Sequence, residues 1–190
     1  GRGVMTLAAV SIEEDDARRL VRRFRRETGL ESELKGSRID LEERALFFDL
    51  LAGTSASATV GIAISALRPE AGVDRGDHDR EVYLALLEDV IGSLLPAGGA
   101  CIDVIMDDGR YDAPAQVRIR QDIGRAVGPL GLASLGLSHQ LPGLQIADVV
   151  ANSFYNRALV SDRQARIAEI LQPLLDSGQI RMRILSPEAE

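Results

Sequence analysis

The sequence predicts a single α/β domain built on a sheet that is at least half parallel. Strand-like and helix-like segments alternate along most of the chain, at residues 58–67, 80–95, 100–107, 113–127, 132–138 and 144–159. Because parallel neighbours need a crossover connection, usually a helix, this alternation predicts a sheet covered by helices. With 190 residues and 45% hydrophobic side chains, we expect residues 1–190 to form one domain around one core.

Two helices are predicted between the first strand and the second. VMTLAAVSI (4–12) is apolar and β-branched, as strands are. The helix predicted over 13–28 ends at Gly29, and LEERALFFDLLA predicts another helix over 41–52. Between them, ESELKGSRID (31–40) is polar, has no clean period and is expected to be a loop. The sequence thus predicts a helical insertion after the first strand.

Turn residues separate the later elements. RPEAGVDRGDHD (68–79) is rich in charge, proline and glycine and is expected to be an exposed loop. The amphipathic helix over 80–95 is closed by Pro96. Residues 160–190 form a C-terminal extension, with a helix over about 162–176 and a strand over 179–185.

Composition limits the environment and the partners. No apolar run approaches the roughly 20 residues that span a bilayer, so no membrane contact is expected. The single cysteine, Cys101, excludes a disulfide framework and a cysteine-rich zinc site, which favours a reduced, cytoplasmic setting. A net charge of −7 excludes a protein that coats nucleic acid indiscriminately.

Basic charge is nevertheless clustered. ARRLVRRFRR (17–26) holds six arginines and is either a solvated helix face, with Leu20, Val21 and Phe24 turned inward, or a phosphate-facing patch. The chain has 21 arginines and one lysine, Lys35. A lysine spared under such a bias suggests that this position needs an ammonium group.

The helix over 144–159 carries its polar residues on one stripe. Gln145, Asp148, Asn152 and Tyr155 lie at i, i+3, i+7 and i+10, while apolar residues such as Val149 occupy the other side. This pattern indicates a helix face that needs polar contact while the rest of the helix packs in the core.

Carboxylates also collect at the end of the strand in CIDVIMDDGR. Asp107 falls at its C-terminal end, where open α/β sheets place their sites, and Asp108 follows; alternatively, both acids simply begin a loop. Glu33, close to Lys35, is a further candidate. Carboxylates that converge at one sheet edge repel one another, and a hard divalent cation such as Mg²⁺ relieves this repulsion. Such a site suits phosphoryl chemistry, with Lys35 at its rim holding the scissile phosphate.

Three of these segments resemble a known family. ELKGSR (33–38), the strand ending VIMDD (104–108) and GLQIADVVA (143–151) after Ser138 look like the domain-of-unknown-function family 3800. The resemblance covers most of the chain, to about Tyr155, and the GLQIAD helix is its most specific element. It implies a ribonuclease H-like mixed sheet covered by helices.

The resemblance also implies an acidic metal site. The catalytic residues that it implies are Asp107, Asp148, Glu33 and Lys35. The three acids among them would bind Mg²⁺ or Mn²⁺, and Gln145 would orient or support Asp148. The supporting residues that it implies are Gln145, Asp108 and Ser138, with Asp108 as the less favoured alternative to Asp107.

One element of that family has no counterpart here. Its members begin with a strand that ends Asp-Glu-Ser-Gly and supplies the central metal ligand, whereas this sequence opens GRGVMTL. We expect that such a strand is missing from the sequence, because a ribonuclease H-like sheet without it would expose long unpaired edges. Otherwise the protein lacks that aspartate.

Two functions are predicted. The first is a divalent-metal-dependent nuclease or phosphodiesterase, a hydrolase acting on nucleic acid. The second is a non-catalytic ribonuclease H-like module that binds nucleic acid or a protein partner. An unrelated α/β enzyme has little support, because no GxGxxG after a strand, GKS/T or GxSxG motif is found. His78 and His139 are interpreted as loop histidines, although His139 precedes the motif helix and could reach the site.

Overall fold

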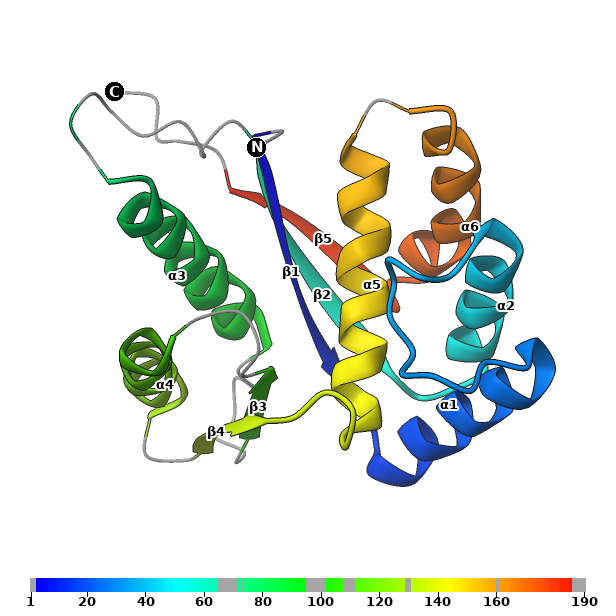
Figure 1. Ribbon diagram of the computed structural model, residues 1–190, viewed down its shortest axis with the longest axis horizontal. Coiled ribbons are helices and arrows are strands. Elements are labelled where there is room, and N and C mark those ends of the chain that lie inside the picture. The colour runs from blue at the N-terminus through cyan, green and yellow to red at the C-terminus, as the bar shows by residue number, and fades with distance from the viewer. Residues whose placement is uncertain are drawn as a thin grey trace.

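The computed structural model describes residues 3–64, 72, 74–94, 102–107, 112–128, 131–159 and 161–185. Figure 1 shows the elements that these residues form, in the order β1 (Val4–Ser11), α1 (Glu14–Thr28), α2 (Leu41–Ala52), β2 (Ser57–Ile64), α3 (Arg75–Leu94), β3 (Ile102–Asp107), α4 (Ala113–Val127), β4 (Gly131–Gly136), α5 (Pro142–Ala158), α6 (Gln164–Asp176) and β5 (Ile180–Leu185). Every predicted element is present at or near its expected bounds, and α1 and α2 form the helical insertion after β1.

The start of α3 corrects one prediction. The helix begins at Arg75, inside the segment 68–79 that was expected to be an exposed loop. Asp74 supplies the physical reason, because its side chain accepts hydrogen bonds from the backbone N–H groups of Gly76 and Asp77, at 2.8 and 3.2 Å. A carboxylate that satisfies the free N–H groups of a first turn stabilises a helix start.

The strands form two sheets within the described residues. In the first, β1 pairs antiparallel with β2 over its whole length, and β2 pairs in parallel with β5, so this sheet is mixed. In the second, β3 pairs in parallel with β4 and ends with Asp107 opposite Gly136. Helix α4 is the crossover that the parallel pair requires.

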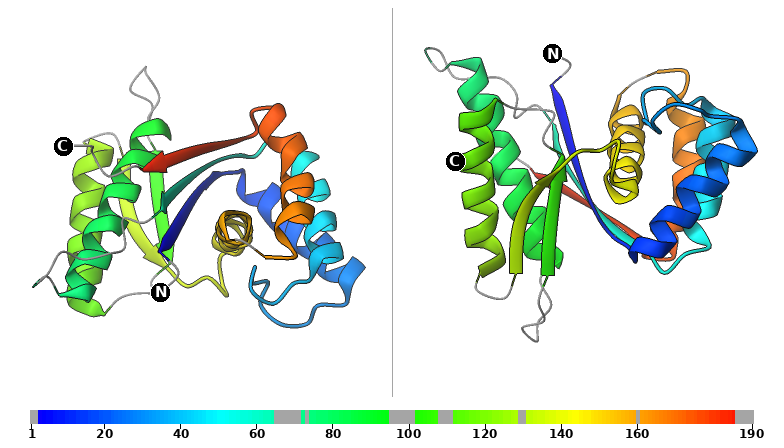
Figure 2. Two further views of the ribbon diagram at one scale, coloured as in Figure 1. Left: turned by 90° about the horizontal axis from the view of Figure 1, so that it is seen from above. Right: turned by 60° about the horizontal axis from the view of Figure 1, so that its bottom comes forward.

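Helices cover both faces of the mixed sheet (Figures 1 and 2). α5 packs against β1 and β2 on one face, together with α1, α2 and α6, and α3 packs on the other face. The two-residue period of β2 explains this arrangement. Val60 and Ile62 point into the main core with α5, whereas Ala63 lies in a smaller cluster with Leu86 of α3.

The two sheets share a core without pairing. Leu7 of β1 packs in the same hydrophobic cluster as Val104 and Met106 of β3, and Figures 1 and 2 show the sheets side by side. Among the described residues, β1 pairs only with β2 and β3 only with β4. One edge of β1 and one edge of β3 therefore carry unpaired backbone groups within the described part of the chain.

Gly61 lets α3 approach β2 closely. A Cβ atom at this position would lie 2.8 Å from Cγ2 of Val90 and 3.0 Å from Cδ2 of Leu86. The packing of α3 on the sheet therefore depends on a residue without a side chain.

Gly61→Ala is expected to lower the free energy of unfolding by about 1–3 kcal/mol, because overpacking displaces the side chains of α3. Gly92→Ala is the matched control. Gly92 lies in α3, and a Cβ added there meets nothing within 4 Å. Alanine at that position should raise stability by up to about 1 kcal/mol through its helix propensity. Urea unfolding followed by circular dichroism measures both, and an unchanged midpoint for Gly61→Ala would contradict the close packing.

Candidate functional site

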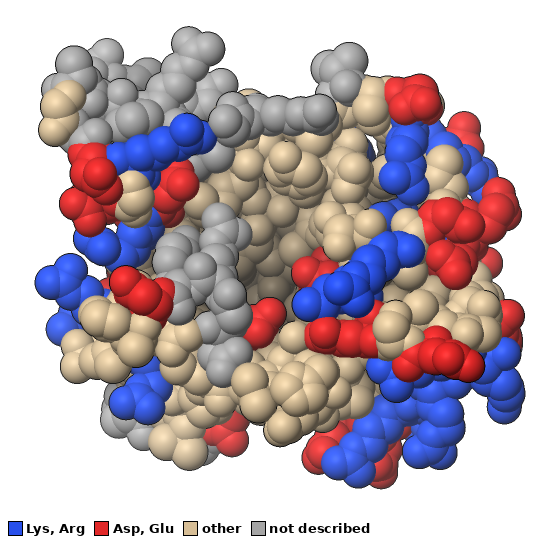
Figure 3. Space-filling view, in the orientation of Figure 1, with Lys and Arg blue, Asp and Glu red and all other residues tan. Residues whose placement is uncertain are grey.

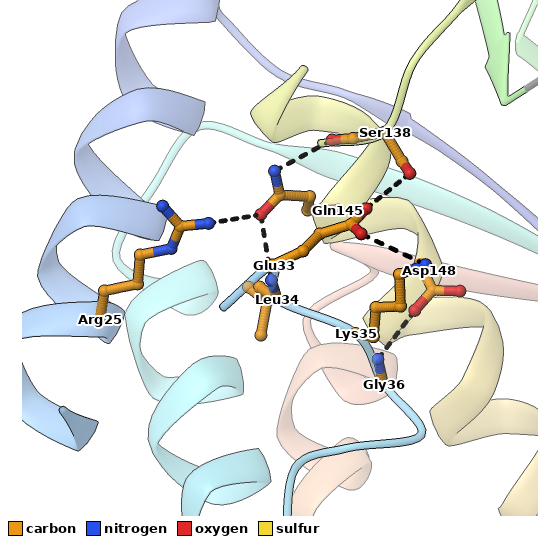
Figure 4. A network of polar contacts seen from close by, with 8 residues as sticks. All are labelled: Arg25, Glu33, Leu34, Lys35, Gly36, Ser138, Gln145 and Asp148. Carbon is orange, nitrogen blue, oxygen red and sulfur yellow. Dashed lines mark hydrogen bonds and ion pairs between the residues drawn. The ribbon is translucent and has the colours of Figure 1, made fainter. Parts of the chain in front are cut away.

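The candidate site forms where the segment after α1 meets the start of α5. Figure 4 shows Glu33, Lys35, Ser138, Gln145 and Asp148 in one network of polar contacts. They come from three stretches of the chain: the 33–38 segment, the turn that precedes α5, and α5 itself. The structure thus brings together five of the residues singled out in the sequence.

Gln145 is the buried centre of this network. The residue is buried, with 3% of its surface exposed. Its Oε1 accepts hydrogen bonds from the backbone N–H of Leu34 at 3.3 Å and from Nη2 of Arg25 at 3.5 Å, and its Nε2 donates to the carbonyl oxygen of Ser138 at 2.9 Å. Gln145 therefore ties α1, the 33–38 segment and the turn before α5 to one point. No hydrogen bond joins it to Asp148 among the described residues, so it supports Asp148 only through the 33–38 segment.

Asp148 holds the next part of that segment. Its Oδ2 accepts a hydrogen bond from the backbone N–H of Gly36 at 2.8 Å. The residue is exposed, and within the described chain its second carboxylate oxygen has no hydrogen-bond partner. A Cβ at Gly36 would lie 2.5 Å from Cβ of Asn152 and 3.0 Å from the carbonyl oxygen of Asp148. Only glycine therefore lets the segment come this close to α5.

Glu33 is engaged through both carboxylate oxygens. One accepts a hydrogen bond from the Ser138 hydroxyl at 2.6 Å, and the other lies 3.2 Å from Nζ of Lys35. The Ser138 hydrogen bond first, and then Lys35, lower the pKa of Glu33 below its ordinary value of 4.5. His139, which is exposed, adds a smaller effect in the same direction. Glu33 therefore stays ionised and is held in place by neighbours of its own chain.

Arg44 is a further member of the site that the sequence analysis did not single out. It is 1% exposed; its guanidinium donates to the carbonyl oxygen of Gly36 at 2.6 Å and to Oδ1 of Asn152 at 3.2 Å, and it also bonds the Ser153 hydroxyl. Burial lowers its pKa to about 10, aided by the nearby charge of Arg163 and opposed by that of Asp148. The sequence does carry a signal for this residue. Arg44 precedes Phe47, Phe48 and Leu51 at the i, i+3, i+4 and i+7 positions of a buried helix stripe.

Asp107 lies at the same end of the sheets as this network. It is exposed at the C-terminal end of β3, and its strand partner is Gly136, two residues before Ser138. Neighbouring strands are spaced about 4.8 Å apart, so the backbone of Asp107 lies beside Gly136, where the chain leaves β4 toward Ser138. Asp108, the alternative ligand, lies outside the described residues, as does Cys101.

The described acids do not by themselves form a metal site. Carboxylates have the right chemistry for Mg²⁺ or Mn²⁺. Within the described ranges, however, no three histidine, cysteine, aspartate or glutamate side chains are grouped so that they could hold an ion. Both oxygens of Glu33 are already occupied, and Asp148 commits one of its two. At least one further ligand is needed before these residues fit a divalent cation.

The arginine-rich helix α1 is mainly a solvated face. Leu20, Val21 and Phe24 are buried as expected. Three of its arginines form ion pairs within the helix, Arg18 with Glu14, Arg19 with Asp16 and Arg23 with Glu27. Figure 3 accordingly shows basic and acidic side chains interspersed over this part of the surface.

Comparison with known proteins shows a similarity of fold. No protein-family model and no curated protein matches the chain. Among solved structures, it is similar to a chain of the PCNA:RNase HII complex from Archaeoglobus fulgidus, with a TM-score of 0.52 and 15% identity over 93% of this chain and 70% of that chain. The fold is ribonuclease H-like. At this identity the likeness establishes an α/β fold with a mixed sheet and helices similar to RNase HII, and nothing about activity. No helix in the described ranges is long and apolar enough to cross a membrane.

Gln145→Leu is expected to destabilise the protein, because it leaves the buried N–H of Leu34 without a partner and removes the shorter of two hydrogen bonds to the carbonyl oxygen of Ser138. Each unsatisfied group costs about 1–3 kcal/mol. Hydrogen exchange should become faster at Leu34 in particular, since that amide is held by Gln145 alone among the described contacts. Gln140→Leu, at an exposed position of the preceding turn, is the control. Unchanged exchange at Leu34 would show that Gln145 does not anchor the segment.

Glu33→Gln is expected to lower the melting temperature at neutral pH, because it removes the ion pair with Lys35. Since the pKa of Glu33 is lowered in the folded state, its stabilising effect is present above 4.5 and is lost as the pH falls through the lowered value. The difference between the parent protein and Glu33→Gln should therefore vanish at low pH. Glu31→Gln, exposed two residues before Glu33, should follow the parent curve at every pH. A difference that persists in strong acid would mean that the carboxylate charge is irrelevant.

Proposed function

We propose that this chain is a divalent-metal-dependent nuclease of ribonuclease H-like type, which hydrolyses phosphodiester bonds in nucleic acid with Mg²⁺ or Mn²⁺ as cofactor. The observation that carries the proposal is the exposed carboxylate of Asp148, which is fixed through one oxygen by Gly36 while its other oxygen has no partner among the described residues. Asp107 ends β3 opposite Gly136, and Lys35, the one lysine of the chain, pairs with Glu33 in the same network as Asp148. The fold likeness to RNase HII agrees with this class of reaction.

In this proposal Asp107 and Asp148 are the metal ligands that the chain exposes. Glu33 is fixed by the hydrogen bond from Ser138, and its ion pair positions Lys35 to bind a phosphate group. Gln145 and Arg44 keep the 33–38 segment rigid, because they bind its backbone at Leu34 and at Gly36. The resemblance to the domain-of-unknown-function family 3800 is part of the same proposal.

We further propose that an additional strand lies between β1 and β3 and supplies the third acid. The unpaired edges of β1 and β3 and their shared hydrophobic cluster support such a position. Gly3, at the start of β1, has a φ of 67°, a left-handed conformation that is typical of tight turns. A hairpin into β1 would place the preceding strand along its free edge. The Asp-Glu-Ser-Gly strand of the resembling family would occupy this position.

A second candidate function is a non-catalytic module that binds nucleic acid or a protein. The full engagement of Glu33 by Ser138 and Lys35 favours it, as does the lack of a three-acid group among the described residues. The two candidates differ in whether a divalent ion binds, and one experiment separates them.

Asp148→Asn is the decisive variant, because its amide oxygen can still accept the hydrogen bond from Gly36 while the charge is lost. We expect Mn²⁺ to raise the melting temperature of a version extended at its N-terminus by an Asp-Glu-Ser-Gly strand, and not that of Asp148→Asn in the same version. Saturation at a hundredfold excess over Kd corresponds to about 2.7 kcal/mol. The same proteins are then incubated with labelled DNA and RNA, with and without a chelator.

The melting temperatures without metal are the control for folding: Asp148→Asn should melt cooperatively and slightly below its parent, because it keeps the hydrogen bond from Gly36 and loses its favourable charge toward Arg44. If Mn²⁺ stabilises neither, or stabilises both equally, the nuclease proposal fails. The non-catalytic module then becomes the better account.

A further inference from the structure

The far edge of the mixed sheet, away from the candidate site, combines an open strand with exposed apolar side chains. β5 pairs only with β2 in the described chain, so its outer edge presents unpaired N–H and C=O groups. Met182 and Ile184, on one face of β5, are 40% and 55% exposed, and Ile64 at the end of β2 is 43% exposed. Figure 2 shows β5 at the rim of the sheet.

A groove runs beside this edge, between the sheet and the helices α5 and α6. Its volume is about 480 Å³, and every residue that lines it lies in the described chain. Phe154 of α5 lies at its base, and the small side chains Ala165 and Ala168 of α6 form one wall. Met182 and Ile184 form the wall on the side of β5. The groove therefore continues the apolar face of the open strand.

Arginines surround this apolar strip. Arg157 stands beside the groove, with its guanidinium 5.9 Å from the ring centroid of Phe154 and its Nη1 3.3 Å from the sulfur of Met182. On the other face of β5, Arg183 pairs with Asp89 of α3, whereas Arg181 is exposed. Within the described residues neither Arg157 nor Arg181 has a carboxylate partner. The surface around β5 is therefore apolar along one face, whereas the other face carries the Arg183–Asp89 ion pair and the exposed Arg181.

We propose that β5 and the adjoining groove bind an extended segment of a partner protein as an added strand. Main-chain hydrogen bonds to the open edge provide the affinity of such an interaction, and pockets for alternate side chains provide its specificity. Here the alternate side chains that enter the groove are apolar. On the opposite face an acidic side chain lies across from Arg181, which has no carboxylate partner among the described residues.

The charges of β5 favour an acidic partner strand over a second copy of this chain. If two copies of β5 paired antiparallel, Arg181 would lie opposite Arg183, or Arg183 opposite itself. Like charges directly opposite in a sheet destabilise the pair, whereas opposite charges contribute favourably. A strand that alternates apolar and acidic residues satisfies both faces of β5 at once.

The test uses the full chain and a fluorescent synthetic peptide of alternating valine and glutamate, long enough to pair with all six residues of β5. Fluorescence anisotropy should show saturable binding, and hydrogen exchange should slow at β5 amides that face outward. A peptide with lysine in place of glutamate should not bind. Arg181→Glu should weaken the glutamate peptide, since it reverses a charge at an exposed position.

Ile184→Glu is the decisive variant, because its carboxylate would have to be covered by the apolar side chains of the added strand, and it should weaken binding roughly tenfold or more. Leu132→Glu is its matched control, since Leu132 is 70% exposed on β4, outside the groove. Both variants should melt as the parent does. The proposal is overturned if the glutamate peptide does not bind, or if it binds Ile184→Glu as well as Leu132→Glu. It is also overturned if the chain dimerises and Ile184→Glu abolishes the dimer, because a second copy is then the occupant.

Discussion

The close contact between Gly36 and α5 is the constraint on which the candidate site depends. The 33–38 segment has no helix or strand of its own, and its composition gives it little reason to order alone. Because Gly36 has no side chain, its backbone reaches α5. Its N–H donates a hydrogen bond to the carboxylate of Asp148 on α5, and its carbonyl oxygen accepts one from the guanidinium of Arg44 on α2. Both polar groups of one residue are thereby satisfied by side chains. Glu33 and Lys35 lie in the same segment, so their positions depend on this contact between Gly36 and α5.

This anchor requires a buried cation. A guanidinium as buried as that of Arg44 is costly unless its donors are satisfied, and the hydrogen bonds to Gly36, Asn152 and Ser153 satisfy most of them. None of these partners is charged. The charge of Asp148 raises the pKa of Arg44 and partly offsets the burial. Asp148 thus stabilises the segment twice, through Gly36 and through Arg44, and its carboxylate is constrained before any ligand binds.

Local periodicity was sufficient to predict the elements of the fold, and non-local contacts limited the rest. Alternation and turn residues located each strand and helix, and the stripe on α5 indicated that Gln145 and Asp148 share one face of the helix. The stripe did not predict that Gln145 is buried and Asp148 exposed. That difference depends on the 33–38 segment, more than 100 residues away in the sequence, which covers Gln145 and leaves Asp148 exposed. Arg44 was missed because an arginine in a helix is usually solvated. The separation of the strands into two sheets is also non-local, since no pattern within β1 or β3 specifies the strand beside it.

Under the proposed function, the balance of charge would couple metal binding to the pairing of the two sheets. Three cations, Arg25, Lys35 and Arg44, accompany the two carboxylates of Glu33 and Asp148 in the network, although the whole chain carries a net charge of −7. A local excess of positive charge attracts a phosphate but repels a divalent cation. Additional carboxylates must therefore converge on Asp148 before a cation binds favourably. Under the proposed function these are Asp107 and an acid from a strand between β1 and β3, so joining the two sheets and completing the metal site become one event.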